Sequence, residues 1–294
     1  MNQINSNTNK SHNRKKSQLK EIWKRLKKSK LALVGFVILI ILFIVAIFAN
    51  VIAPYDYAKQ NLQNTFQFPC AAHIFGTDEF GRDIFSRVVY GTRISLSVGF
   101  IAVGIAAFIG GILGAVAGYY GGKADNIVMR FMDVLLAIPQ ILLAISIVAA
   151  LGSGLQNLMI AVGISSIPGY ARIVRASVLS IKDQEFVEAA KAAGSSDLRI
   201  IFHHIIPNSM APIIVQATLG VAIAILTAAG LSFIGLGIQP PTPEWGSMLS
   251  GGRQYIRDYW YMTLFPGLAI VITIFALNVL GDGLRDALDP KLKN

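Results

Sequence analysis

The sequence predicts an all-α fold, that of a polytopic membrane protein with six transmembrane helices. Hydrophobic residues make up 54% of the 294 residues and charged residues only 14%, and the mean hydropathy is +0.57. A water-soluble domain of this length does not show such a balance. Six apolar runs are also close to the length of about 20 residues that a helix needs to cross a bilayer. These runs are 31–53, 94–118, 132–151, 157–173, 211–236 and 261–281.

Residues 1–30 form a basic tail before the first apolar run. Ten of the 26 Lys and Arg residues lie in this tail, which indicates a topology signal and attraction to anionic lipid rather than a nucleic-acid site. The first 20 residues or so have almost no apolar content, so the tail is expected to be partly disordered. The run at 31–53 is too long for the core of a cleaved signal peptide and predicts an uncleaved first span.

A long segment, 54–93, separates the first two spans. It ends in GTDEFGRDIFSRVVYGTR, where Asp83 is suited to cap a short amphipathic helix that leads into the second span. Within that span, Gly110 and Gly114 have the four-residue spacing that allows two membrane helices to pack closely. The alternative interpretation is that glycine is simply commoner in membrane helices than in soluble ones.

The later spans are less regular than the first two. Pro168 and Gly169 interrupt the fourth run. The segment 239–260, before the last span, begins QPPTPEW; its prolines cannot continue the fifth helix, and its Trp and Tyr side chains suit the membrane interface. Asn278 is one of the few strongly polar residues inside a span.

A polar segment, SIKDQEFVEAAKAAGSSDLRIIFHHIIPN, lies between the fourth and fifth spans. Ser180 and Asp183 have capping-box spacing, and strong helix formers follow from Glu185. Gly194 is expected to end this helix in the left-handed conformation, after which Ser195 and Ser196 can cap a second short helix. Pro207 is expected to end that second helix, which predicts an L-shaped helix–turn–helix.

The distribution of basic residues predicts the sidedness of the chain. With six spans, both termini and the polar segment lie on one side of the membrane, and 20 of the 26 Lys and Arg residues fall on that side. The positive-inside bias therefore places both termini, including the tail at 282–294, in the cytoplasm. The segments 54–93 and 239–260 are then expected to be extracellular.

The chain lacks the signatures of several alternative functions. Its Gly122-Lys123 pair is followed by Ala124, so it has no P-loop for ATP. The spans carry no carboxylate or His pathway of the kind that coupled carriers use. The neighbouring His203 and His204 point about 100° apart on a helix, which argues against a metal site. Cys70 is the single cysteine, so no intrachain disulfide is possible. We expect no catalytic, cofactor-binding or metal-binding residues.

The polar segment resembles a loop of known transporters. Glu188-Ala189-Ala190, then Gly194, then an apolar stretch ending at Pro207 match the EAA loop of the membrane subunits of bacterial ABC importers, E-A-A-x3-G-x9-I-x-L-P. His204 stands at the usual Ile position and Ile206 at the usual Leu position, which are departures from the pattern. The spacing of triplet, Gly and Pro is kept.

Three further stretches narrow the resemblance to the C-type, second permease subunit of the dipeptide/oligopeptide/nickel permease family. They are HIFGTDEFGRDIFSRVVYGTRISL at 73–96, LSFIGLGIQPPTPEWGSML at 231–249 and LGDGLRDALDP at 280–290. The resemblance covers nearly all of the chain after residue 30. Ala228 stands where many relatives carry a Glu, so no role of that carboxylate transfers to this chain.

The resemblance implies a type I ABC importer permease fold, with a permease core at 94–281 that contains a cytoplasmic coupling loop at 174–210. It implies a complex with a homologous permease subunit, two ATPase subunits that bind the ATP and Mg²⁺, and an external peptide-binding protein. A coupling helix at about 182–193 would contact an ATPase through an apolar stripe flanked by two acidic residues. The residues assigned to this contact are Glu185, Phe186, Glu188, Ala189, Ala190, Ala193, Gly194 and Pro207. Alternatively, the same stripe lies against its own protein or the bilayer surface.

The resemblance thus predicts a non-catalytic permease subunit in a bacterial plasma membrane, part of an ATP-driven importer of dipeptides or oligopeptides. Import of nickel or another small solute is the alternative within the family. A stand-alone secondary carrier and an intramembrane enzyme are alternatives from other classes. The sequence does not identify the residues that line the translocation pathway.

Overall fold

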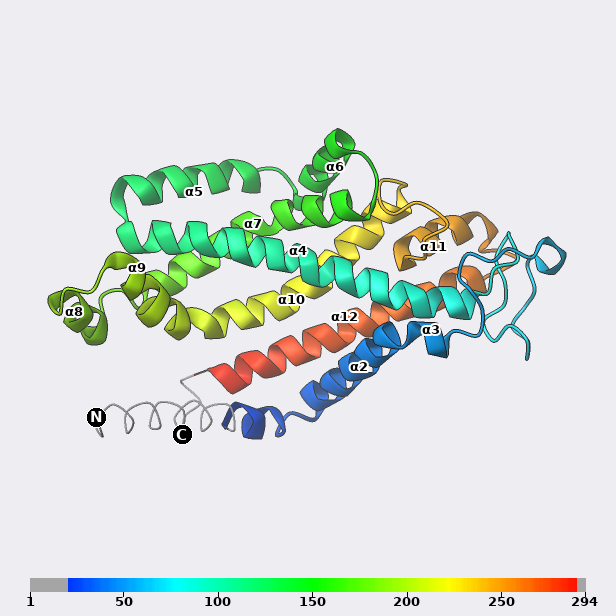
Figure 1. Cartoon of the computed structure of the whole chain (residues 1–294), viewed down its shortest axis with the longest axis horizontal. Helices are drawn as coiled ribbons and strands as arrows, with labels where there is room; N and C mark the ends of the chain where they lie inside the picture. Colours follow the sequence, from blue (N-terminus) through cyan, green and yellow to red (C-terminus); the bar gives the residue numbers. More distant parts are fainter. Residues whose placement is uncertain (1–20, 290–294) are drawn as a thin grey trace, which may run out of the picture.

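The computed structural model describes residues 21–289, so the predicted disorder of the first 20 residues and the last residues of the C-terminal tail lie outside the described part of the chain. Within 21–289 the chain is helical, and its only bridge of strand type joins Thr77 and Asp83. Figure 1 shows the long helices running side by side along the long axis of the molecule. The all-α prediction is confirmed.

Residues 21–26 are helical, and the chain then forms α2 (Lys30–Ile47), α3 (Ala49–Ile52), α4 (Ile84–Tyr120), α5 (Gly122–Leu136), α6 (Gln140–Leu151), α7 (Leu155–Leu179), α8 (Glu185–Ala192), α9 (Asp197–Ile200), α10 (Ile206–Phe233), α11 (Trp245–Gly252) and α12 (Tyr261–Leu288). Short 3-10 turns lie at Leu62–Asn64 and Arg253–Tyr255, and a π-helical turn lies at Ile201–Ile205. Five of the long helical stretches between residues 21 and 289 can cross a membrane by length and composition, and α5 with α6 makes a sixth crossing if the pair is one bent span.

The prediction of one straight membrane-spanning helix at 132–151 is wrong. α5 begins ten residues earlier, at Gly122, and the chain bends by 89° between Leu136 and Gln140. Pro139 lies in this break. Proline has no N–H to donate and disfavours helical backbone in the residue before it, so the run of apolar residues does not continue as one helix. By contrast, α7 continues through Pro168 to Leu179.

The second span is longer than predicted. The Asp83 side chain accepts a hydrogen bond from the Ser86 amide at 2.7 Å, which confirms the helix cap. The helix that begins there is not a separate short one, because α4 continues without a break to Tyr120. The amphipathic first turns and the apolar span therefore form a single rod.

Glycines of α4 bring it against α7. A Cβ added at Gly110 would lie 2.7 Å from the Ile167 carbonyl oxygen, and one at Gly114 would collide with the backbone of Ala171. Contacts of this closeness leave no room for any side chain. The close-packing interpretation of this glycine spacing is confirmed.

Part of the segment 239–260 is folded back into the end of the bundle. Trp245 is fully buried and its indole N–H donates to the Val88 carbonyl at 3.1 Å, so this side chain packs against the protein and not against lipid. Glu244 caps α11 by accepting from the amides of Gly246 and Ser247. Burial raises the pKa of Glu244 above its usual range because the charged form loses its hydration.

Candidate functional site

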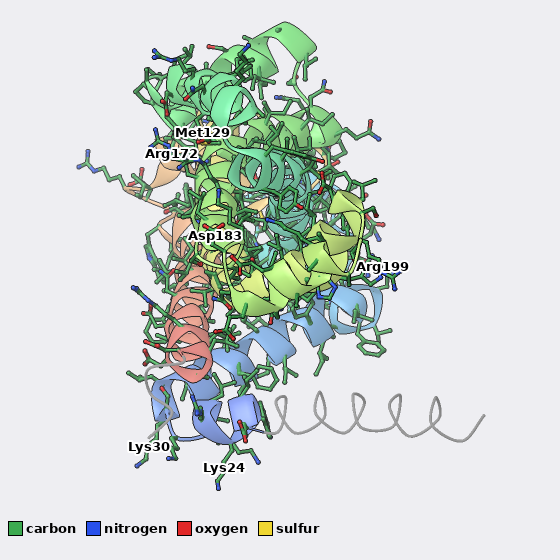
Figure 2. All side chains as sticks on the ribbon, turned by 90° about the vertical axis from the view of Figure 1, so that its left-hand side faces the viewer. Lys24, Lys30, Met129, Arg172, Asp183 and Arg199 are labelled. Atoms are coloured by element: carbon green, nitrogen blue, oxygen red, sulfur yellow. The ribbon has the colours of Figure 1, made fainter. Side chains whose placement is uncertain are left out.

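The predicted site lies at one end of the bundle. α8 and α9 project there, at the end where α2 begins and α12 terminates (Figure 1). Figure 2 looks onto this end, with Asp183 near the middle of the view and Arg172 and Arg199 on opposite sides of it. The segment predicted as the coupling loop, 174–210, thus connects two spans, α7 and α10.

The predicted capping box at the start of α8 does not form. The Ser180 hydroxyl donates to the carbonyl of Ser177, and Ser180 itself terminates α7. The N-cap of α8 is Gln184, which makes no side-chain cap. α7 extends several residues beyond its predicted end, so Ser180 belongs to the turn that closes the preceding helix.

Gly194 ends α8 as predicted. Its φ is +76°, a left-handed conformation that glycine adopts without a Cβ penalty. The Ser195 amide donates to the Ala190 carbonyl at 3.1 Å and the Gly194 amide to Lys191 at 2.9 Å, the pattern of a Schellman cap. Ser196 then precedes α9 in an extended conformation, although its side chain makes no cap hydrogen bond.

Pro207 does not end the second helix, contrary to the prediction. The backbone passes through the π-helical turn Ile201–Ile205 and continues directly into α10, with Pro207 in its first turn. The Ile206 amide donates to the Ile201 carbonyl, five residues back. At this position the backbone changes from π-helical to α-helical hydrogen bonding. Pro207 has no N–H to donate, and the helix tolerates this at such a change of hydrogen-bond pattern. α9 and α10 are therefore joined as one stiff stretch.

The predicted apolar stripe of α8 is divided between two faces. Ala190 is buried, together with Val187, which the sequence analysis did not single out. Phe186, Ala189 and Ala193 are exposed. The buried pair packs into a cluster formed with α4, α7 and the start of α10, consisting of Ala115, Val174, Val178, Ile181, Val187, Ala190, Ile200, Ile201 and Ile205.

The burial of Val187 has a sequence signal. Val187 and Ala190 are spaced three apart, so they share one side of the helix. Phe186, Ala189 and Ala193 follow the i, i+3, i+7 spacing of the adjacent side. α8 is thus apolar over more than one stripe, and only tertiary packing selects which stripe is covered.

Polar contacts also hold α8 and α9 against the bundle. The Tyr119 hydroxyl at the end of α4 donates to Asp197 at 2.7 Å, and the Lys191 ammonium lies 5.6 Å from the centre of the Tyr119 ring. Glu185 and Glu188 are exposed. Within residues 21–289 neither carboxylate lies within 4.0 Å of a basic group, so neither pairs with the neighbouring Lys182 or Lys191.

A few side chains make up the outward-facing side of α8 and of the turn that follows it. We call it the α8 surface; it consists of Glu185, Phe186, Glu188, Ala189, Ala193 and Gly194. It combines two carboxylates without basic partners, one aromatic ring and three small residues. Such a surface is suited to enter a groove closely and to pair there with basic groups.

The chain is similar to known transport proteins. The family of binding-protein-dependent transport system inner membrane components matches residues 110–294, and the N-terminal TM domain of oligopeptide transport permease C matches residues 17–69. The dipeptide transport system permease protein DppC of Alkalihalophilus pseudofirmus is 54% identical over 95% of this chain and 91% of its own length. The glutathione transport system permease protein GsiD of Escherichia coli O157:H7 is 50% identical, over 93% and 90%.

A third relative, the di/tripeptide transport system permease protein DppC of Pseudomonas aeruginosa, is 46% identical over 95% of this chain and 94% of its own. Among solved structures, a chain of the inward-facing MetNI methionine ABC transporter matches with a TM-score of 0.58 and 20% identity, over 70% of this chain and 98% of that one. This likeness confirms the predicted importer permease fold. The chain is a multi-pass membrane protein that belongs to the family of binding-protein-dependent transport system inner membrane components.

Proposed function

We propose that the chain is the permease subunit of an ATP-driven importer of dipeptides or short oligopeptides, and that the α8 surface docks on an ATPase subunit. The relatives carry names of dipeptide, di/tripeptide and glutathione permeases, which supports peptides over nickel. A homologous permease, two ATPase subunits that bind ATP and Mg²⁺, and an external binding protein complete the importer. This chain itself supplies no catalytic residue.

The division of α8 into a buried and an exposed face is the observation that carries this proposal. Val187 and Ala190 fix the helix to α7 and to the start of α10, while Glu188 and Ala189 face outward. α8 is thus attached to its own protein on one side, and its acidic side is left exposed on a stiff connection between two spans. An exposed acidic face in this place supports docking on a partner.

The same contacts specify how the motion is transmitted. When the ATPase subunits close on ATP, a docked α8 moves with them. Because Val187 packs in one cluster with Val174 of α7 and Ile205 before α10, both spans move with α8. The translocation pathway between the two permeases then opens outward, and hydrolysis reverses the movement.

Reconstitution tests the proposed function. The full chain, the homologous permease, both ATPase subunits and the binding protein are placed in proteoliposomes, and uptake of a labelled dipeptide is measured. We expect uptake only when ATP, Mg²⁺ and the binding protein are all present, with ⁶³Ni²⁺ uptake at background level. Uptake by this chain alone, driven by a proton gradient, would instead identify a secondary carrier.

The proposed sidedness has a direct test in the single cysteine. Cys70 is exposed and lies in the segment proposed to be extracellular. We expect a membrane-impermeant maleimide to label it in intact spheroplasts. The matched control is Cys70→Ser combined with Asp183→Cys, since Asp183 is also exposed but at the opposite end. This variant should react only after permeabilisation; the reverse pattern contradicts the orientation.

A further inference from the structure

An apolar groove runs along α2 on the outside of the bundle. Its volume is about 350 Å³. One wall is a single face of α2, on which Phe36, Leu39, Ile40 and Phe43 follow i, i+3, i+4, i+7 spacing, so the wall is roughly 10 Å long. The facing walls come from α4, α10 and α12, and they are lined by Phe100, Val103, Ile214, Ala217, Thr218, Val221, Leu277 and Leu280. Thr218 is the only polar residue in this lining.

A cluster of lysines lies beside one end of α2. We call Lys24, Lys27, Lys28 and Lys30 the basic collar; all four side chains are exposed. Figure 2 shows Lys24 and Lys30 at the edge of the molecule. Glu21 is the single acidic residue between 21 and 30. The collar therefore presents four exposed ammonium groups next to an apolar span, and with Arg25 and Arg285 they outnumber the carboxylates of Glu21, Asp282, Asp286 and Asp289 around them.

The basic collar is held in place by packing. The Arg25 guanidinium donates to the Asp289 carbonyl oxygen at 3.4 Å, and Leu26 is buried against α12 near Gly283. The Ser29 hydroxyl caps α2 by accepting from the Ala32 amide. The lysines of the collar are thus attached to a backbone that is anchored to both α2 and α12.

A chain of ring contacts joins the collar to the groove. The Lys27 ammonium lies 5.2 Å from the centre of the Trp23 ring. Trp23 in turn meets Phe36 edge to face at 5.4 Å, and Phe36 is the groove residue nearest the start of α2. At the remote end, the rings of Phe43 and Phe100 meet at 5.4 Å. The half-exposed Trp23 indole therefore lies between the positively charged collar and the apolar groove.

We propose that this composite is a binding site for one anionic phospholipid, with the headgroup phosphate at the basic collar and an acyl chain in the groove. Trp is favoured at the depth where headgroup and acyl chain meet, and lysines near the membrane surface attract anionic lipid. An apolar helix from a partner would fill the groove but has no use for the collar. The charge complementarity therefore favours a lipid as the occupant.

Native mass spectrometry of the delipidated full chain tests the site, with palmitoyl-oleoyl phosphatidylglycerol and the matching phosphatidylcholine as probes. We expect a tight phosphatidylglycerol complex whose affinity falls at least tenfold in the triple variant Lys24→Gln/Lys27→Gln/Lys28→Gln. The control Lys123→Gln/Arg130→Gln removes two exposed basic side chains from α5 and should change the affinity less than twofold. Phosphatidylcholine should bind weakly, and neither the triple variant nor the control variant should change its affinity.

The groove is tested separately. Ala217→Phe, or Thr218→Phe should the first variant fold poorly, fills the groove without altering any lysine and should release the lipid severalfold faster. Equal binding of both lipids, an unaffected triple variant, or unchanged lipid release from both filled grooves overturns the proposal. The proposal is also overturned if a filled-groove variant no longer co-purifies with the homologous permease while its lipid binding is unchanged. That result would show that the homologous permease occupies the groove. The lipid-binding measurements use this chain alone, so their outcome is independent of the proposed transport function.

Discussion

Replacing Glu188 with Lys is expected to leave the chain in the membrane at its normal level and to reduce ATP-driven peptide uptake at least about tenfold. The side chain is exposed and has no basic partner within the described residues, so its loss costs little stability. At a docked interface the same change places a positive charge against basic groups. Such repulsion costs several kcal/mol, and about 1.4 kcal/mol already gives a tenfold effect.

The measurement is uptake by the reconstituted importer, together with the amount of ATPase that co-purifies with the permeases. Asp183→Lys is the matched control, because it makes the same charge change at an exposed residue of the same end but before α8 begins. That control should retain most uptake. Normal uptake by a well-expressed Glu188→Lys variant would remove Glu188 from the docking surface, even with the transport function intact.

Replacing Gly114 with Ala is expected to destabilise the fold by about 1–3 kcal/mol, the usual cost of forcing an extra group into a packed interface. The new methyl group would collide with the Ala171 carbonyl oxygen and lie 2.9 Å from the Val174 Cβ. Both belong to α7, whose backbone cannot withdraw without opening the whole α4–α7 contact. Higher helix propensity returns at most about 1 kcal/mol.

Gly111→Ala provides the control within the same helix. A Cβ at Gly111 meets nothing within 4 Å, so this variant should be as stable as the wild type or slightly more stable. Thermal unfolding in nanodiscs, followed by near-ultraviolet circular dichroism, compares the two. If the Tm of the Gly114→Ala variant equals that of the Gly111→Ala variant, the α4–α7 contact is looser than described here.

Local features of the molecule were predictable from short stretches of sequence. Gly194 adopts its left-handed turn, and Asp83 caps α4, because these outcomes depend on backbone conformation within a few residues. Capping was less predictable where helices compete for a residue. Ser180 has the right spacing to begin α8, yet it terminates α7, since the length of the preceding helix decides which role it takes.

The sequence by itself determined the fold class, the apolar runs that are long enough to cross a membrane, and the end of α8 at Gly194. These features depend on composition and on neighbouring residues. Tertiary structure alone decided the burial of Trp245 and the choice of Val187 rather than Phe186 as the buried side of α8. Each of these results from contact between segments far apart in the chain. A periodic pattern indicates that a helix has an apolar face, but the partner that covers the face is set by packing.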